Sequence, residues 1–160
     1  MRAMVATVDV YNVLKFLHIM AAVVWVGGAI LLQAMAQFAL KSNLSGRAAE
    51  FAGEVEVIGK RFFTPLSVVV LVLGIGLVQQ GDWGFGKPWV ILGMLGIVAT
   101  IATGAGYLGP QMGKLAKVIE AEGADAPSVR TKMKTILNVA RIDIVVLVVI
   151  IFVMVTKVGQ

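Results

Sequence analysis

His18 is the only histidine of this 160-residue sequence and the side chain best suited to chemistry. It lies in a long apolar stretch, where an ionisable residue is costly and usually faces the interior of a helix bundle or a water-filled cavity. Three roles are open to it: a hydrogen bond to a neighbouring helix, axial ligation of haem iron, and copper or proton handling. A thioether can complete a His/Met haem site, and Met154 is the candidate for the opposite position, with Met94 as the alternative.

The helical face around His18 supplies the other candidate binding residues. At 3.6 residues per turn, Lys15 and Trp25 share this face and Gly28 lies at its edge. Lys15 is placed to bind a haem propionate or a lipid headgroup, or simply to extend to the membrane interface. The predicted cofactor-binding set is therefore His18, Met154, Lys15, Trp25 and Gly28, with His18 as the metal ligand.

Haem is the cofactor expected at this site, and copper is a weaker alternative. Soft copper sites need several Met, Cys or His ligands that converge, whereas this sequence has no cysteine and its eight methionines are scattered along the chain. A bundle without any cofactor is the third alternative. The sequence shows no nucleophile–base pair, paired carboxylates or phosphate-binding glycine loop. We therefore lean towards a protein that is not an enzyme.

The elements that must position these residues are membrane-spanning helices. The chain is 59% hydrophobic and only 14% charged, against about 25% charged residues in ordinary soluble domains. Each span needs about 20 apolar residues, and four such stretches lie at about residues 10–40, 61–80, 88–109 and 138–157. We predict an all-α, four-transmembrane-helix bundle of up-down-up-down order, forming one integral membrane domain over residues 1–160. Residues 43–60 are expected to form a short interfacial helix, and the third helix to extend past Pro110 on the cytoplasmic side.

The helical rise indicates which residues share the depth of His18. With about 1.5 Å per residue and alternating helix directions, glycines of the second and third helices come to this level. The fourth helix contributes residues 152–154, and the glycines are Gly74, Gly76, Gly93 and Gly96. Such small residues either leave room for a planar cofactor or let helices approach closely. The sequence leaves both interpretations open.

Four polar residues within the spans need partners. Gln33 and Gln37 lie one turn apart, and we expect them to donate hydrogen bonds between helices. Arg141 and Asp143 are two residues apart and so do not face each other. Each is expected to find its partner on another helix or among lipid headgroups.

The distribution of lysine and arginine predicts the orientation. Nine of these residues lie in or beside the first and third loops, against four at the termini and the second loop. By the positive-inside rule, both termini are extracytoplasmic. Because the basic residues are spread between apolar runs, the net charge of +5 indicates topology, and the expected partner is the lipid bilayer and not nucleic acid.

Three motifs resemble a group of small bacterial membrane proteins. Residues 14–28, LKFLHIMAAVVWVGG, look like the first helix of the copper-resistance D family, of HemJ-type protoporphyrinogen oxidases, and of an uncharacterised integral membrane family related to both. Residues 61–65, RFFTP, are similar to their second helix, and residues 104–110, GAGYLGP, to the end of the third helix in the uncharacterised family. With a single histidine, the chain fits the uncharacterised family best.

The resemblance implies a multi-pass protein of the bacterial cytoplasmic (inner) membrane. The oxidase relatives imply haem, and the copper-resistance relatives imply copper movement. The competing functions are a haem-binding or copper-handling protein that uses His18, a non-catalytic accessory subunit of a larger respiratory or transport complex, and a HemJ-like oxidase. A homo-oligomer is a further expectation for the assembly.

Overall fold

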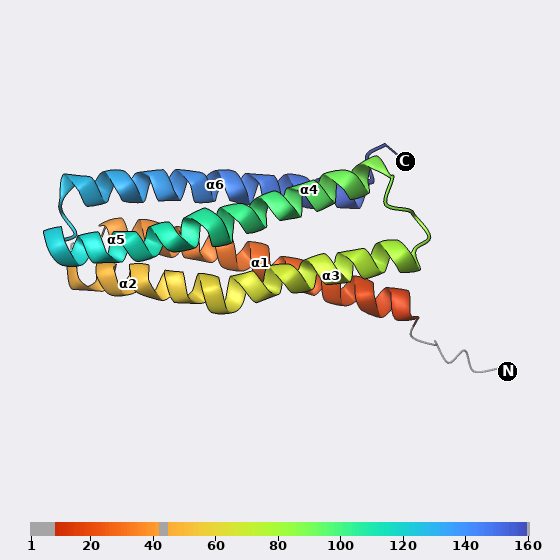
Figure 1. The fold of residues 1–160 in the computed structure, drawn as a ribbon, viewed down its shortest axis with the longest axis horizontal. Helices are drawn as coiled ribbons and strands as arrows, with labels where there is room; N and C mark the ends of the chain where they lie inside the picture. Colours follow the sequence, from red (N-terminus) through yellow and green to blue (C-terminus); the bar gives the residue numbers. More distant parts are fainter. Residues whose placement is uncertain (1–8, 42–44, 160) are drawn as a thin grey trace.

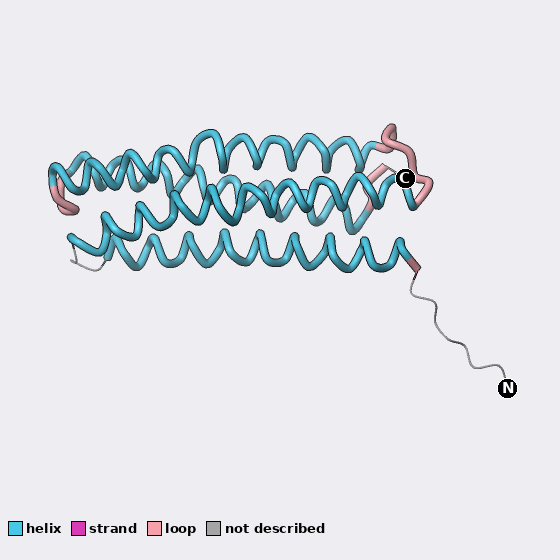
Figure 2. Tube along the Cα trace, turned by 60° about the horizontal axis from the view of Figure 1, so that its bottom comes forward, coloured by secondary structure: helices cyan, strands magenta, loops and turns pink. Residues whose placement is uncertain are grey.

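Helices account for almost all of the chain that the computed structural model describes, which is residues 9–41 and 45–159. Side chains are described for residues 9–38 and 48–159. Within these ranges four helices are long and apolar enough to cross a membrane, namely Val10–Phe38, Ala48–Gln80, Pro88–Glu122 and Pro127–Thr156. The prediction of an all-helical fold with four such helices is confirmed, and Figure 2 shows loops only at the ends of the helices.

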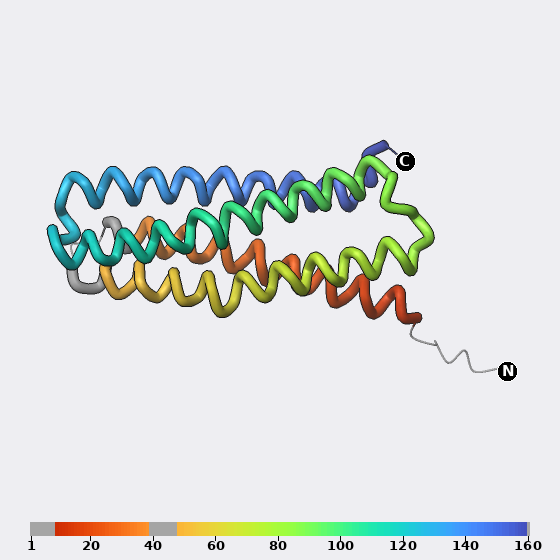
Figure 3. The backbone as a smooth tube through the Cα atoms, in the orientation of Figure 1, coloured from red at the N-terminus to blue at the C-terminus, as the bar shows by residue number. Residues whose placement is uncertain are grey.

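The four long helices are built from eight helical segments. The first and last are single segments, α1 (Val10–Lys41) and α6 (Pro127–Thr156). The second joins α2 (Ser45–Ile58), the π-helical turn η1 (Gly59–Phe63) and α3 (Thr64–Gln80), and the third joins α4 (Pro88–Thr103), the π-helical turn η2 (Gly104–Leu108) and α5 (Gly109–Glu122). Figures 1 and 3 show successive long helices running in opposite directions, with the start of α1, the α3–α4 turn and the end of α6 at one end of the bundle.

The segment expected to be an interfacial helix is instead part of the second long helix. From Ser45 to Ile58 it is α2, which continues without a break into η1 and α3 and packs against α5; residues 43 and 44 of the expected helix lie outside the described residues. Small side chains explain this packing, because Ala52 is fully buried in a core cluster with Met112 and Leu115 of α5. The α2 face that carries Ala52 is therefore used for packing on α5 and not for contact with the membrane surface.

The two π-helical turns have the same cause. Pro65 and Pro110 each lie two residues beyond a π turn. Proline has no backbone N–H, and its ring clashes with the carbonyl four residues earlier in a regular helix. A π turn widens the helix locally, and here it closes with a bond across five residues, from Thr64 N–H to Gly59 O and from Gly109 N–H to Gly104 O. Both long helices therefore pass through a proline without ending.

The buried side chains form three clusters along the bundle. At the α2–α5 end, the cluster joins α1, α2, α5 and α6. In the middle, Trp25, Val70, Ile97 and Leu147 bring one side chain from each long helix. At the α3–α4 turn, Val78, Trp89 and Val90 are buried beneath Met154 and Trp83. The middle cluster separates the surroundings of His18 from the other half of the bundle.

Candidate functional site

His18 is fixed by the backbone of α3. Its Nδ1 lies 3.0 Å from the carbonyl oxygen of Val70. Because a carbonyl oxygen can only accept, Nδ1 must carry the proton in this bond, and a neutral ring then keeps its lone pair on Nε2. The ring also lies against Gly74, where an added Cβ would be 3.2 Å from His18 Cε1. The structure thus shows the interhelical hydrogen bond and holds one tautomer.

Met154 packs against a different helix. A Cβ at Gly93 of α4 would overlap the end of the Met154 side chain, so the thioether sits directly on the α4 backbone. The depth argument is correct for these pairs, since Gly74 meets His18 and Gly93 meets Met154. The described contacts of His18 are with α3, however, whereas those of Met154 are with α4 and the cluster at the α3–α4 turn.

The remaining predicted residues occupy three environments. Lys15 is exposed, and its Nζ lies 5.8 Å from the centre of the Tyr11 ring. Trp25 is only 7% exposed and belongs to the middle cluster. Gly28 accommodates the Phe63 ring, because an added Cβ would be 2.9 Å from Phe63 Cζ. Trp25 and Gly28 therefore support packing around the π turn, and Lys15 alone is free to meet a ligand outside the bundle.

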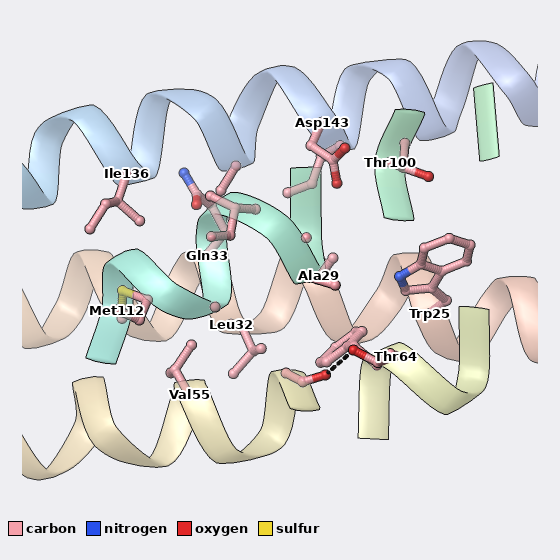
Figure 4. Close-up of a pocket in the computed structure, with 18 of the residues that line it drawn as sticks. Trp25, Ala29, Leu32, Gln33, Val55, Thr64, Thr100, Met112, Ile136 and Asp143 are labelled. Atoms are coloured by element: carbon pink, nitrogen blue, oxygen red, sulfur yellow. Dashed lines mark hydrogen bonds between the residues drawn. The ribbon is translucent and has the colours of Figure 1, made fainter. Parts of the chain in front are cut away.

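A pocket that the sequence did not predict lies between the two π turns. It encloses about 140 Å³, and we name it the π-turn pocket. Both turns contribute to its wall, with Gly59 and Phe63 from η1 and Gly104 and Leu108 from η2. The lining is mainly apolar and includes Trp25. Its polar members are Gln33, Thr64, Ser67, Thr100 and Asp143, and Figure 4 labels all of these except Ser67.

Gln33 lines this pocket and has an unused hydrogen-bond acceptor. Its Nε2 donates to the carbonyl oxygen of Leu137 on α6 at 3.1 Å, which confirms the predicted interhelical bond. That bond orients the amide, and Oε1 is buried with no hydrogen-bond partner among the described residues. A buried acceptor left without a partner costs about 1–3 kcal/mol. This atom is the one polar group of the pocket that most requires a ligand or water.

Asp143 brings the only carboxylate to the pocket lining. It is partly buried on α6, and Figure 4 shows its carboxylate directed from that helix towards the middle of the bundle. The ion pairs among the described side chains are Lys60–Glu56 and Arg130–Asp125, both elsewhere. Arg141 is exposed. Within residues 9–38 and 48–159, then, no basic side chain pairs with Asp143.

The hydroxyl groups of the pocket are also acceptors. Thr64 Oγ1 donates to Gly59 O at 3.0 Å, Ser67 Oγ to Thr64 O at 2.7 Å, and Thr100 Oγ1 to Ile97 O at 3.0 Å. Each hydroxyl donates its one hydrogen bond to a carbonyl of its own helix, and its oxygen lone pairs remain able to accept. Together with Gln33 and Asp143, they give the pocket five side chains with acceptor oxygens, against one donor in the indole N–H of Trp25.

The signal for this pocket was present in the sequence. The motifs RFFTP and GAGYLGP both end in a proline, and the structure places a π turn two residues before each one. π turns occur often at functional sites. The spans predicted at about residues 61–80 and 88–109 include no wider turn at either proline. No group of three or more His, Cys, Asp or Glu side chains gathers within the described residues.

An aromatic cluster marks the end of the bundle that carries the α3–α4 turn. Lys157 Nζ lies 4.1 Å from the centre of the Trp83 ring, and the rings of Trp83 and Trp89 meet edge to face with centres 5.0 Å apart. Tryptophan and lysine gather at membrane interfaces. This cluster fits the level of the lipid headgroups. It lies at the end of the bundle where α1, the helix that carries His18, begins.

Comparison with known proteins gives a family and no closer relative. Residues 12–158 match the family described as predicted integral membrane protein (DUF2269). No curated protein and no solved structure matches the chain.

Proposed function

We propose that this chain, which belongs to the DUF2269 family of predicted integral membrane proteins, binds haem through His18. The observation that carries the proposal is the hydrogen bond from Nδ1 to Val70 O. Histidines that ligate metals almost always donate their other ring N–H to a carbonyl or carboxylate, which fixes the tautomer and raises the basicity of the ligating nitrogen. His18 has this arrangement, with Nε2 as the ligating atom.

The residues around His18 would hold haem through one iron ligand and one propionate contact. Gly74 lets the imidazole lie close to α3, which restrains the ring. Lys15, three residues before His18 on the same helix and exposed, is positioned to pair with a propionate. Met154 packs on α4, so we assign it no ligating role. Bound haem would supply one-electron redox chemistry, and the chain's own contribution is to hold, orient and shield the group.

The same residues favour haem over copper. Soft copper sites need several converging Met, Cys or His ligands, and the chain has one histidine and no cysteine. The resemblance to HemJ-type oxidases also supports haem. We limit the proposal to haem binding, because the described contacts of His18 are with α3 and include no second titratable side chain.

Spectroscopy of the purified protein tests the proposal. Protein extracted in mild detergent should show a Soret band. In His18→Asn, the amide nitrogen can replace Nδ1 and keep the bond to Val70 O, whereas Nε2 is lost, so the band should disappear while helicity is retained. His18→Gln is the variant matched to His18→Asn, because its longer side chain does not place an amide nitrogen at the position of Nδ1. A wild-type protein that shows no Soret band after haem has been added and the unbound haem removed by gel filtration would overturn the proposal and favour the accessory-subunit alternative.

We further propose that the protein lies in the bacterial inner membrane with both termini outside the cytoplasm. The support is the excess of lysine and arginine in and beside the α1–α2 and α5–α6 connections. Because the chain has no cysteine, single cysteines report topology without background. Phe85→Cys, in the α3–α4 turn, should react with a membrane-impermeant maleimide in intact cells, and Asp125→Cys, between α5 and α6, should not. The opposite labelling pattern would reverse the orientation.

A further inference from the structure

We propose that the π-turn pocket binds a small organic cation, a protonated amine that carries a compact apolar group. This site is separate from His18, which faces α3 on the other side of the middle cluster. Both π turns contribute to its wall; they contact each other and widen two neighbouring long helices at the same level. This part of the pocket wall therefore depends on two backbone turns, each followed by a proline, and not on the position of one side chain.

The polar groups of the pocket call for a ligand that donates hydrogen bonds. Gln33 Oε1 is buried without a partner, and its direction is set because Nε2 is already bonded to Leu137 O. The hydroxyls of Thr64, Ser67 and Thr100 have used their protons on their own helices and can only accept from a ligand. A ligand with two or three N–H donors would satisfy these atoms, whereas an anion or a carbonyl would add another acceptor.

The charge of the pocket calls for a positive ligand. Asp143 lines the wall and has no cationic partner among the described side chains, whose ion pairs both lie elsewhere. A carboxylate in a membrane span is expensive and almost always pairs with another group or marks a ligand path. An ammonium group offers the opposite charge and three donors in one atom. Asp143 therefore matches the head of a primary amine, and Gln33 Oε1 adds a second acceptor in the same lining.

The walls and the volume determine the rest of the ligand. The lining is largely apolar, with Trp25, Phe63 and Leu108 among its members. A cavity of about 150 Å³ in another protein holds benzene, and this pocket encloses about 140 Å³, which suits one small ring or a short branched chain. Hard metal ions are a poorer fit, because Ca²⁺ and Mg²⁺ take six or more oxygen ligands and this lining has one carboxylate.

Calorimetry on the detergent-purified full chain tests the inference with two probes of equal size. The first is 2-phenylethylamine, which is protonated at neutral pH, and the second is 2-phenylethanol, which is neutral. Wild-type protein should bind the amine saturably, at one site per chain, and should bind the alcohol at least about tenfold more weakly, a difference of about 1.4 kcal/mol. This comparison requires no variant, so it does not depend on the folding of a mutant. Titration of empty micelles removes the contribution of partitioning.

Variants then locate the site. Asp143→Asn keeps the size of the side chain and should weaken amine binding about tenfold or more, with little effect on the alcohol. Asp82→Asn makes the same chemical change at an exposed position in the α3–α4 turn and should leave amine binding unchanged. Circular dichroism must show equal helicity in all three proteins.

Three results would overturn the inference. The first is no saturable binding of the amine by the wild-type protein, and the second is equal binding of amine and alcohol, which would reduce the pocket to an apolar cavity. The third is equal loss of amine binding in Asp143→Asn and Asp82→Asn. A loss of the Soret band in His18→Asn, or its absence from the wild type, concerns the other site and leaves this test intact.

Discussion

Replacing Gln33 with leucine should stabilise the protein, although it removes an interhelical hydrogen bond. The bond from Nε2 to Leu137 O is 3.1 Å long, and such bonds in membrane proteins contribute about 0.6 kcal/mol on average. The same substitution removes Oε1, a buried acceptor without a partner, which costs about 1–3 kcal/mol. Leucine is close to glutamine in size, so little cavity or overlap results. The free energy of unfolding should therefore rise by about 0.5–2 kcal/mol.

The assay is unfolding of the purified protein in mixed micelles with increasing SDS, followed by circular dichroism. Gln37→Leu is the matched control, because Gln37 is one turn further along α1 and exposed. It should change the free energy of unfolding by no more than about 0.5 kcal/mol. If Gln33→Leu lowered the free energy of unfolding by more than the hydrogen bond alone is worth, Oε1 must have a partner, and the account of an acceptor-rich pocket would be wrong.

Two further predictions concern packing and the membrane interface. Gly28→Ala should destabilise the fold by about 1–3 kcal/mol, because the new Cβ would lie 2.9 Å from Phe63 Cζ. Gly27→Ala, where a Cβ would meet nothing within 4 Å, should instead stabilise the helix by about 0.5–1 kcal/mol. Equal effects of the two substitutions in the SDS assay would contradict the α1–η1 contact. Lys157→Ala should cost about 0.5–1 kcal/mol through the lost cation–π contact with Trp83. This loss should be smaller in a Trp83→Leu background, where only the longer contact with Trp89, at 5.9 Å, remains. A double-mutant cycle that shows no coupling would refute the contact.

The four helices and the relative depth of their residues could be predicted from the sequence. Composition alone requires membrane-spanning helices, and the rise per residue brought Gly74 to His18 and Gly93 to Met154, as the structure shows. These features are local, because they depend only on helix geometry and on where each apolar run begins. The hydrogen bond of Gln33 was also expected, since a buried amide in a span has few other choices.

The π-turn pocket could not be predicted in the same way. A proline near the start of an apolar run can begin a helix or lie inside a longer one, and only the packing of α2 on α5 decides in favour of the second at Pro65. Likewise, no sequence pattern tells which atom of Gln33 reaches α6 and which is left in the pocket. Tertiary packing determines both the continuation of the helix through Pro65 and the orientation of the Gln33 amide. The sequence therefore predicts a site at His18 but not the π-turn pocket.

The most direct test of haem ligation uses the fact that His18 is the only histidine of the chain. Resonance Raman spectra of the reduced, haem-loaded protein should contain an iron–histidine stretching band that shifts when histidine is labelled with ¹⁵N. The band should be absent from His18→Asn. A haem-loaded wild-type protein whose spectrum shows no band sensitive to ¹⁵N-histidine would contradict ligation by His18.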